Sequence, residues 1–253
     1  MFAEERYQKI LALIHQHGKV EVKDISKALQ VSEATIRRDL TELEQQQLLK
    51  RTHGGAVPYS RTTHEATYQD REVKNIEIKQ AIAAEAVKLI NPGEIILLDA
   101  GTTNMEIARL LTPEHKVTVV TNAINIAQQI AAIGLPLLII GGELRPTTQA
   151  MVGMYSEMML KELTVDKLFL GTNGISLKQG LTTPNVNEAM TKRAMVSQAK
   201  QVIVVADHTK LGCDSFSKIT DLTSIDCLIT DSSASQELCE QISDQGIWVI
   251  RAS

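Results

Sequence analysis

Residues 21–57 read EVKDISKALQVSEATIRRDLTELEQQQLLKRTHGGAV, and this stretch decides how the N-terminal part of the chain folds. Val22, Ile25 and Leu29 lie at helical spacing and predict one apolar helix face, which is interrupted directly afterwards. Ser32 follows the interruption, and its hydroxyl can accept a backbone N–H from the first turn of a second helix. A helix, a break and a capped helix in this order are typical of a helix-turn-helix.

The second helix of this stretch has one apolar and one polar face. Ile36, Leu40 and Leu43 recur at helical spacing and are expected to face inward. The other face carries acidic, hydroxyl and guanidinium groups, those of Glu33, Thr35, Arg37, Arg38 and Thr41. Short hydroxyl side chains and arginines are what a helix needs to read base edges in the major groove. We therefore expect double-stranded DNA to be contacted by Ser32, Thr35, Arg37 and Arg38.

The chain from Leu48 to Val57 is short, alternates apolar with polar residues and is broken by two glycines. This pattern predicts a two-stranded wing whose basic side chains reach the phosphate backbone, namely Lys50, Arg51 and His53. The alternative is an ordinary amphipathic helix pair followed by a hairpin, with solvated arginines. A basic wing placed directly after the helices argues against that alternative.

Length and composition favour two globular domains. The chain has 253 residues, of which 43% are hydrophobic and 22% charged, so a sizeable core can form. Aromatic residues make up only 3%, which argues against single-stranded nucleic-acid binding on stacked aromatic side chains. The net charge of −4 does not by itself indicate DNA binding, but affinity follows local phosphate contacts and not the total charge.

The three cysteines, Cys213, Cys227 and Cys239, have neither the even number of a disulfide framework nor the spacing of a thiolate metal site. We expect no metal and no cofactor. The N-terminus lacks an apolar signal segment, and no apolar run approaches the ~20 residues of a membrane span. A cytoplasmic protein without membrane contact is the expectation.

Three regions are expected along the chain: a winged helix-turn-helix domain at residues 1–57, a polar linker at 58–75 and an α/β domain at 76–253. The first should open with a helix at 4–17 that Gly18 ends. In the third, apolar runs alternate with helical patterns, which predicts a mainly parallel sheet. The expected strands are 94–101, 117–121, 135–140, 167–170, 201–206, 227–230 and 248–250, the last with a buried Trp248.

Polar residues follow five of these apolar runs, at the strand ends where open α/β sheets bind ligands. They are 99–104, 121–122, 141–145, 171–174 and 207–210. Gly101-Thr102-Thr103 at the start of a helix predicts a phosphate cradle, because glycine lets the backbone approach an anion and the helix N-terminus adds partial positive charge. The alternative is a capped helix after a tight turn. Arg145 and Lys210 are the cations expected beside a phosphate.

These motifs together resemble those of the DeoR family of bacterial transcriptional regulators of sugar metabolism. The resemblance rests on Arg6, Ile10 and Ile14 spaced by fours, on SEATIRRDL at 32–40 and RTHGGA at 51–56, and on 99–103, 121–122, 141–145, 180–185, 187–188 and 206–210. It implies an effector domain similar to ribose-5-phosphate isomerase, a phosphorylated sugar as effector and a homo-oligomer. The residues expected to bind the effector are Asp99, Gly101, Thr102, Thr103, Thr121, Asn122, Gly142, Arg145, Asn173, Glu188, Asp207 and Lys210.

The implied fold raises the alternative of a sugar-phosphate isomerase or deaminase-like enzyme fused to a DNA-binding domain. Glu188, Asp207 and Lys210 could act as general acid–base groups. The isomerases carry an acidic DGADE-type motif where this chain reads GTNGIS at 171–176, so proton abstraction lacks its carboxylates. We therefore expect binding without turnover, with Glu188 contacting a sugar hydroxyl or Lys192 four residues further on.

The expected function is that of a transcriptional regulator, and by the resemblance a repressor, whose operator affinity is controlled by a sugar phosphate. A further alternative is an architectural DNA-binding protein whose second domain only oligomerises. Turnover of a sugar phosphate would favour the enzyme. A chain that no sugar phosphate stabilises would favour the architectural protein.

Overall fold

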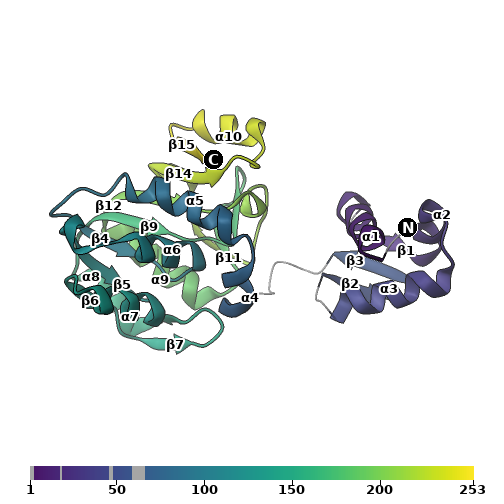
Figure 1. The fold of residues 1–253 in the computed structure, drawn as a ribbon, viewed down its shortest axis with the longest axis horizontal. Coiled ribbons are helices and arrows are strands. Elements are labelled where there is room, and N and C mark those ends of the chain that lie inside the picture. Colours follow the sequence, from purple (N-terminus) through teal and green to yellow (C-terminus); the bar gives the residue numbers. More distant parts are fainter. Residues whose placement is uncertain (1–2, 18, 46–47, 59–65) are drawn as a thin grey trace. The chain divides into compact units, whose positions relative to one another are not determined.

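The computed structural model describes residues 3–17, 19–45, 48–58 and 66–253. They fall into two compact units, which meet in sequence between residues 64 and 65 (Figure 1). The helix end expected at Gly18 and residues 59–65 of the expected linker lie outside the described residues. No helix in the described ranges is long and apolar enough to cross a membrane.

The described part of the first unit combines helices with an antiparallel sheet of strand order β1-β3-β2. Its elements are α1 (Ala3–His17), β1 (Val20–Glu21), α2 (Val22–Leu29), α3 (Glu33–Gln45), β2 (Leu49–Thr52) and β3 (Gly55–Pro58). The apolar side chains at helical spacing meet in one core, built from Ile10, Ile14, Ile25, Leu29, Ile36, Leu40, Leu43 and Leu49. The expected winged helix-turn-helix is confirmed, and β1 adds a third strand to it.

The turn between α2 and α3 follows from local hydrogen bonds. Gln30 ends α2 in the left-handed conformation, with φ 54°, and the N–H of Val31 donates to the carbonyl of Ser26 at 3.2 Å. Ser32 Oγ accepts the N–H of Thr35 at 3.2 Å, which confirms the expected cap of the second helix. In the wing, a Cβ on Gly55 would lie 2.1 Å from the carbonyl oxygen of the neighbouring strand β1, so only glycine fits there.

An ion pair inside the first unit joins its first and third helices. Arg6 Nε of α1 lies 2.5 Å from Asp39 Oδ2 of α3, and Arg6 Nη2 lies 2.8 Å from Asp39 Oδ1. The two side chains are 13% and 4% exposed. The hydrogen bonds to Asp39 raise the pKa of the Arg6 guanidinium. This two-pronged contact orients α3, which carries the residues expected to meet DNA.

The second unit is organised around a seven-stranded sheet of order β15-β14-β12-β9-β4-β5-β6, in which all neighbours are parallel. The strands are β4 (Ile95–Leu98), β5 (Thr118–Thr121), β6 (Leu137–Ile139), β9 (Val165–Leu170), β12 (Ala199–Val205), β14 (Cys227–Asp231) and β15 (Trp248–Ala252). Each strand falls on an apolar run that the sequence marks as a strand. The expected α/β class with a mainly parallel sheet is confirmed.

Helices cover both faces of this sheet. Because successive side chains of a strand point to opposite faces, Ile96 and Leu98 of β4 lie in one core cluster and Leu97 lies in another. The first cluster includes buried side chains of α5 (Ile76–Val87), α6 (Thr102–Leu110) and α7 (Ile124–Ile133). The second includes those of α8 (Met154–Lys161), α9 (Val186–Gln198) and α10 (Gln236–Ser243).

Several elements depart from the expectations. Helix α4 (Tyr68–Val73) lies inside the expected linker and packs against α6. Two small antiparallel sheets are formed by β7 (Glu143–Arg145) with β8 (Ala150–Val152), and by β10 (Gly174–Ser176), β11 (Gly180–Thr183) and β13 (Ser217–Thr220). Single 3₁₀ turns are η1 (Pro113–His115), η2 (His208–Lys210) and η3 (Leu222–Ser224). Trp248 is 55% exposed and not buried, because β15 is an edge strand.

The Arg6–Asp39 pair gives a stability prediction. Arg6→Met should lower the free energy of unfolding of the first unit by about 3–5 kcal/mol, because it leaves a buried carboxylate without its partner. Hydrogen exchange of the α3 amides in the full chain measures this change.

Arg37→Met is the matched control, because the Arg37–Glu33 pair joins side chains that are 53% and 42% exposed. Losing such an exposed pair should change the same free energy by less than about 1 kcal/mol. Equal protection of α3 in both variants would contradict the structural role of the buried pair.

Candidate functional site

A pocket lies over the carboxyl ends of β4, β9 and β12, which are neighbours in the sheet. The loops after these strands form its walls, together with residues of α4, α5 and α9. The lining residues are Arg71, Lys74, Asn75, Lys79, Ala100, Gly101, Thr102, Thr103, Asn104, Gly171, Thr172, Asn173, Glu188, Lys192, Val205, Ala206, Asp207, Thr209 and Lys210. This is the edge of a parallel sheet at which α/β proteins bind ligands.

Seven of the twelve residues expected to bind an effector line this pocket, namely Gly101, Thr102, Thr103, Asn173, Glu188, Asp207 and Lys210. They come from distant parts of the sequence, and the sheet brings them together. The other five do not line the pocket, namely Asp99, Thr121, Asn122, Gly142 and Arg145. Some of these five support the pocket from below, and the others lie away from it.

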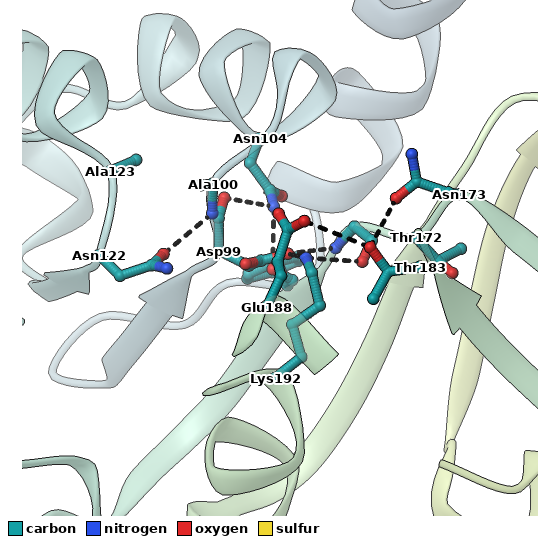
Figure 2. Close-up of polar contacts among 12 residues, drawn as sticks. Asp99, Ala100, Asn104, Asn122, Ala123, Thr172, Asn173, Thr183, Glu188 and Lys192 are labelled. Atoms are coloured by element: carbon teal, nitrogen blue, oxygen red, sulfur yellow. Dashed lines mark hydrogen bonds and ion pairs between the residues drawn. The ribbon is translucent and has the colours of Figure 1, made fainter. Parts of the chain in front are cut away.

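Thr121 and Asn122 lie beneath the pocket and support it. Thr121 Oγ1 donates to the carbonyl of Leu98 at 2.7 Å. Asn122 Oδ1 accepts the N–H of Ala100 at 3.0 Å (Figure 2). Both side chains are buried. They therefore hold the end of β4 and the loop that follows it. Neither side chain lines the pocket, so the expectation that they contact the ligand directly is not supported.

Gly142 and Arg145 follow β6, which lies two places from β4 at the edge of the sheet, and this distance keeps them out of the pocket. A Cβ on Gly142 would lie 2.1 Å from Ser156 Oγ, so this glycine allows close packing on α8. Arg145 acts on the pocket through another residue, because its Nη1 lies 2.8 Å from Glu188 Oε2.

A buried ion pair joins the strand ends below the pocket (Figure 2). Asp99 Oδ2 pairs with Lys192 Nζ of α9, and the same oxygen accepts the N–H of Gly171 at 2.9 Å. Lys192 Nζ also donates to the Gly171 carbonyl at 3.1 Å. Among the described residues its anionic partner is Asp99, so the expected alternative of a Glu188–Lys192 pair is wrong. Burial raises the pKa of the Asp99 carboxyl, and the Lys192 ammonium opposes that rise.

A second polar cluster surrounds Glu188, near the start of α9 (Figure 2). Arg145 Nη1 donates to Glu188 Oε2 at 2.8 Å. Thr183 Oγ1 lies 3.3 Å from the same carboxylate oxygen and 3.1 Å from Asn173 Oδ1. One hydroxyl has a single proton to donate, so it can satisfy only one of these two acceptors at a time. The cluster therefore retains acceptor capacity for a hydroxyl of a ligand.

The loop after β12 is held by two carboxylates. Asp207 Oδ1 accepts the N–H of Thr209 at 2.9 Å and also its hydroxyl. Asp231 accepts the N–H of His208 at 2.7 Å and contacts its Nδ1 at 2.8 Å. Burial acts to raise the pKa of Asp231, but the hydrogen bonds from His208 outweigh it and the pKa is lowered. These bonds position Lys210 in the pocket wall.

Besides Lys192 and Lys210, three further cations line the pocket, and strand-end reasoning does not identify them. Arg71 and Lys74 come from α4 and the residue after it, and Lys79 comes from α5. Lys79 Nζ is buried and donates to the main-chain carbonyls of Arg71 and Lys74. Its burial lowers its pKa. Because residues 58–75 are polar, the sequence predicts a linker there and no pocket residues. The close spacing of Arg71, Lys74 and Lys79 is the signal that could have identified them.

The first turn of α6 lines the pocket and has no side-chain cap. The first N–H groups of a helix have no partner within the helix, and the helix dipole adds partial positive charge. A Cβ on Gly101 would meet no atom within 4 Å, so open space lies beside this backbone. The alternative of a side-chain-capped helix is therefore not what this segment forms, and the phosphate cradle at Gly101-Thr102-Thr103 stays a prediction.

The seven residues expected to contact DNA lie at the start of α3 and on the wing. Thr35 is half-buried, and the others are exposed, namely Ser32, Arg37, Arg38, Lys50, Arg51 and His53. Arg51 Nη1 donates to Thr41 Oγ1 at 2.7 Å, which joins the wing to α3. Arg37, Arg51 and His53 line one hollow between the two elements. Basic side chains of the helix and of the wing, those of Arg37, Arg51 and His53, therefore share one surface.

The cysteines are free thiols, and Cys227 and Cys239 are buried. Burial raises the pKa of the Cys227 thiol to about 12. Within the ranges that the structure describes, no three His, Cys, Asp or Glu side chains are grouped as metal ligands.

The Asp99–Lys192 pair predicts a pH-dependent defect. Lys192→Met should lower the free energy of unfolding by about 3–5 kcal/mol at pH 8, because it strands a buried carboxylate. Without the Lys192 ammonium, nothing offsets the rise that burial causes in the pKa of Asp99. The Asp99 carboxyl of the folded variant therefore keeps a proton that it loses above about pH 4 in the unfolded chain. The loss should therefore be smaller at pH 5 than at pH 8, as measured by urea unfolding followed by circular dichroism.

Lys88→Met is the control, because the Lys88–Glu85 pair at 2.7 Å is exposed, with 66% of the lysine side chain accessible. It should cost less than about 1 kcal/mol at both pH values. A defect of Lys192→Met that is the same at both pH values would contradict the assignment.

Known protein families match both units. A model described as the DeoR-like helix-turn-helix domain matches residues 6–62, and one described as the DeoR C terminal sensor domain matches residues 74–232. The HTH-type transcriptional regulator GlpR of Haloferax volcanii is 40% identical over 250 residues, which are 99% of this chain and 98% of that protein. The HTH-type transcriptional repressor GlcR of Bacillus subtilis is 38% identical over 253 residues, with 99% and 96% covered.

Among solved structures, ribose 5-phosphate isomerase A from Methanocaldococcus jannaschii is similar over 55% of each chain, with 22% sequence identity and a TM-score of 0.42. The relatives that span the whole chain are transcriptional regulators, which agrees with the expectation that the chain is not an enzyme. A winged helix-turn-helix unit, a sensor unit and relatives of the same length agree with each other: the chain belongs to the DeoR family of helix-turn-helix transcriptional regulators.

Proposed function

We propose that this chain binds operator DNA through α3 and the wing, and that a phosphorylated sugar in the pocket over β4, β9 and β12 controls that binding. The observation that carries the proposal is the pocket itself. It combines a helix N-terminus, several cationic side chains and open acceptors for hydroxyl groups. A phosphorylated sugar presents the matching groups, namely an anion and several hydroxyls.

The charge of the pocket supports a phosphate as the anionic part. Its cationic side chains are those of Arg71, Lys74, Lys79, Lys192 and Lys210, and its carboxylates are those of Glu188 and Asp207. Asp99 beneath the pocket neutralises Lys192. The remaining cations still outnumber the carboxylates, and the helix dipole of α6 adds to them. Thr102 and Thr103 supply hydroxyl donors beside that helix start.

The carboxylates of the pocket support binding without turnover. Glu188 is engaged by Arg145, and Asp207 is engaged by Thr209. Each carboxylate is therefore oriented by a partner, Glu188 as a hydroxyl acceptor and Asp207 as a clamp on its own loop, and neither role requires proton transfer. The sugar would be recognised by Asn173 and Glu188, which line the pocket and are both contacted by Thr183 from behind.

The surface of the first unit supports duplex recognition. Thr35, Arg37 and Arg38 stand at the start of α3, where a recognition helix contacts base edges. Lys50, Arg51 and His53 on the wing would contact phosphates. A ligand that binds two states of the protein unequally would shift the affinity of the protein for DNA. We propose that the protein is a repressor and that the sugar phosphate relieves or imposes repression in this way.

We also propose that the chain works as a homo-oligomer. Helix α8 carries three large apolar side chains that are mostly exposed: Met154 at 65%, Tyr155 at 71% and Met158 at 57%. Exposed apolar groups that cluster on one element are typical of protein–protein contact surfaces. Binding of repeated operator half-sites would then follow from the symmetry of the oligomer.

Arg37→Ala should weaken operator binding by about 1–3 kcal/mol, the range for an arginine directed at a base edge. Fluorescence anisotropy with a labelled operator duplex measures the change. Lys88→Ala, at the exposed residue directly after α5, is the control and should bind as the unmodified chain does. Operator affinity that is unchanged in Arg37→Ala would remove this residue from the interface.

Thr102→Ala and Lys210→Ala should abolish the response to ligand and leave operator binding without ligand in place. In a thermal-shift screen of sugar monophosphates, a ligand at 100 times its dissociation constant should stabilise the unmodified chain by about 2.7 kcal/mol. The same compound should change operator affinity. A full response to ligand in both variants would rule out the proposed pocket, and a chain that no sugar phosphate stabilises would rule out the effector.

A further inference from the structure

We propose that Arg71 of helix α4 is a further ligand of the anion in the pocket, so that an occupied pocket ties α4 to the first turn of α6. The inference rests on the sugar-phosphate site proposed above and adds a residue and a route of coupling to it. Four observations carry it: two unsatisfied nitrogens of Arg71, an unsatisfied oxygen of Asn104, the way α4 is attached, and its place in the chain.

The guanidinium of Arg71 lines the pocket and lacks acceptors. Its Nε and Nη2 are buried from solvent and have no hydrogen-bond partner among the described residues. Leaving a buried charged donor unsatisfied is costly, which indicates that an acceptor belongs there. A phosphoryl group presents oxygens at the spacing that a planar guanidinium binds through two parallel N–H bonds.

An acceptor in the same pocket is also unsatisfied. Asn104 is completely buried, and its Nδ2 donates to the carbonyls of Asp99 at 2.8 Å and Phe169 at 3.0 Å (Figure 2). Its Oδ1 has no partner among the described residues, although Asn104 lines the pocket. Unsatisfied donors and an unsatisfied acceptor in one pocket call for a ligand that carries both an anionic group and a hydroxyl. A phosphomonoester of a polyol has both.

Helix α4 is attached to the sensor unit mainly by polar contacts. Lys79 Nζ donates to the carbonyls of Arg71 and Lys74, and Glu72 pairs with Arg109 of α6 at 3.0 Å. Within α4, Tyr68 is the buried residue, whereas Val73 is 77% exposed. A helix of six residues is not stable alone in water, so its position depends on these contacts. An anion bound by both Arg71 and the first turn of α6 would bridge the two helices.

The position of α4 in the sequence suggests how this anion bridge could affect the DNA-binding unit. Helix α4 begins at Tyr68, and the last strand of the winged unit ends at Pro58. The chain between the two units therefore enters the sensor unit at α4. A ligand that fixes α4 also fixes the point from which that connection starts, which is a physical means for the pocket to influence the DNA-binding unit.

The test measures phosphate binding to the full chain with inorganic phosphate as the probe. Titration calorimetry gives the affinity, and hydrogen exchange of residues 68–75 reports the attachment of α4. Arg71→Met should weaken phosphate binding at least tenfold and remove the slowing of exchange that phosphate causes at 68–75. Arg71→Lys should be intermediate, because it keeps the charge and loses the fork of N–H donors. Lys88→Met, directly after α5, should match the unmodified chain in both measurements.

Phosphate affinity within twofold of the unmodified chain in Arg71→Met would overturn the inference. If Thr102→Ala abolishes phosphate binding in the same series, the pocket stands and only the role of Arg71 is lost. An unmodified chain that binds neither phosphate nor any sugar monophosphate would overturn both proposals. Circular dichroism without phosphate checks the fold of Arg71→Met. Should that variant not fold, Arg71→Lys decides, and an affinity within twofold of the unmodified chain would overturn the role of Arg71.

Discussion

A single buried carboxylate, that of Asp99, fixes the architecture of the pocket. It sits at the end of β4, accepts the N–H of Gly171 after β9, and pairs with Lys192 of α9. Three elements that are distant in the sequence therefore meet at one oxygen. The ion pair is excluded from solvent, so its geometry is enforced by the cost of leaving either charge alone. The pocket above it, with its excess of cations, depends on that anchor for its shape.

The fold could be predicted largely from the sequence, because its elements have strong local signatures. The runs 95–98 and 202–206 are apolar throughout, as buried parallel strands are, and Ser32 caps its helix as its position indicates. The antiparallel sheet of β10, β11 and β13 could not be predicted in this way. Its strands have only three or four residues, which is too short for a clear alternation of apolar and polar residues, and β13 pairs with β11 from more than 30 residues further along the chain.

The location of the candidate site could be predicted from the sequence, but the individual residues that line it could not all be predicted. The rule that ligands bind beyond parallel strands identified the loops after β4, β9 and β12, but it gives the same weight to β5 and β6. Thr121 and Asn122 turn their polar groups to the backbone of the neighbouring loop, which only the packing reveals. Lys192 and Lys79 sit on helices, where a basic residue is usually solvated, and their burial depends on contacts across the fold.

Helix α4 has a consequence for how this protein responds to its surroundings. The helix buries one aromatic side chain and is otherwise attached through charges and hydrogen bonds. Dissolved ions limit the reach of exposed charges to about 8 Å at physiological ionic strength. The same ions compete for the phosphates of DNA. A higher salt concentration would therefore weaken the attachment of α4 within the second unit. On the proposed function it would also weaken DNA binding, so ionic strength and effector would act in opposite directions on the order of α4.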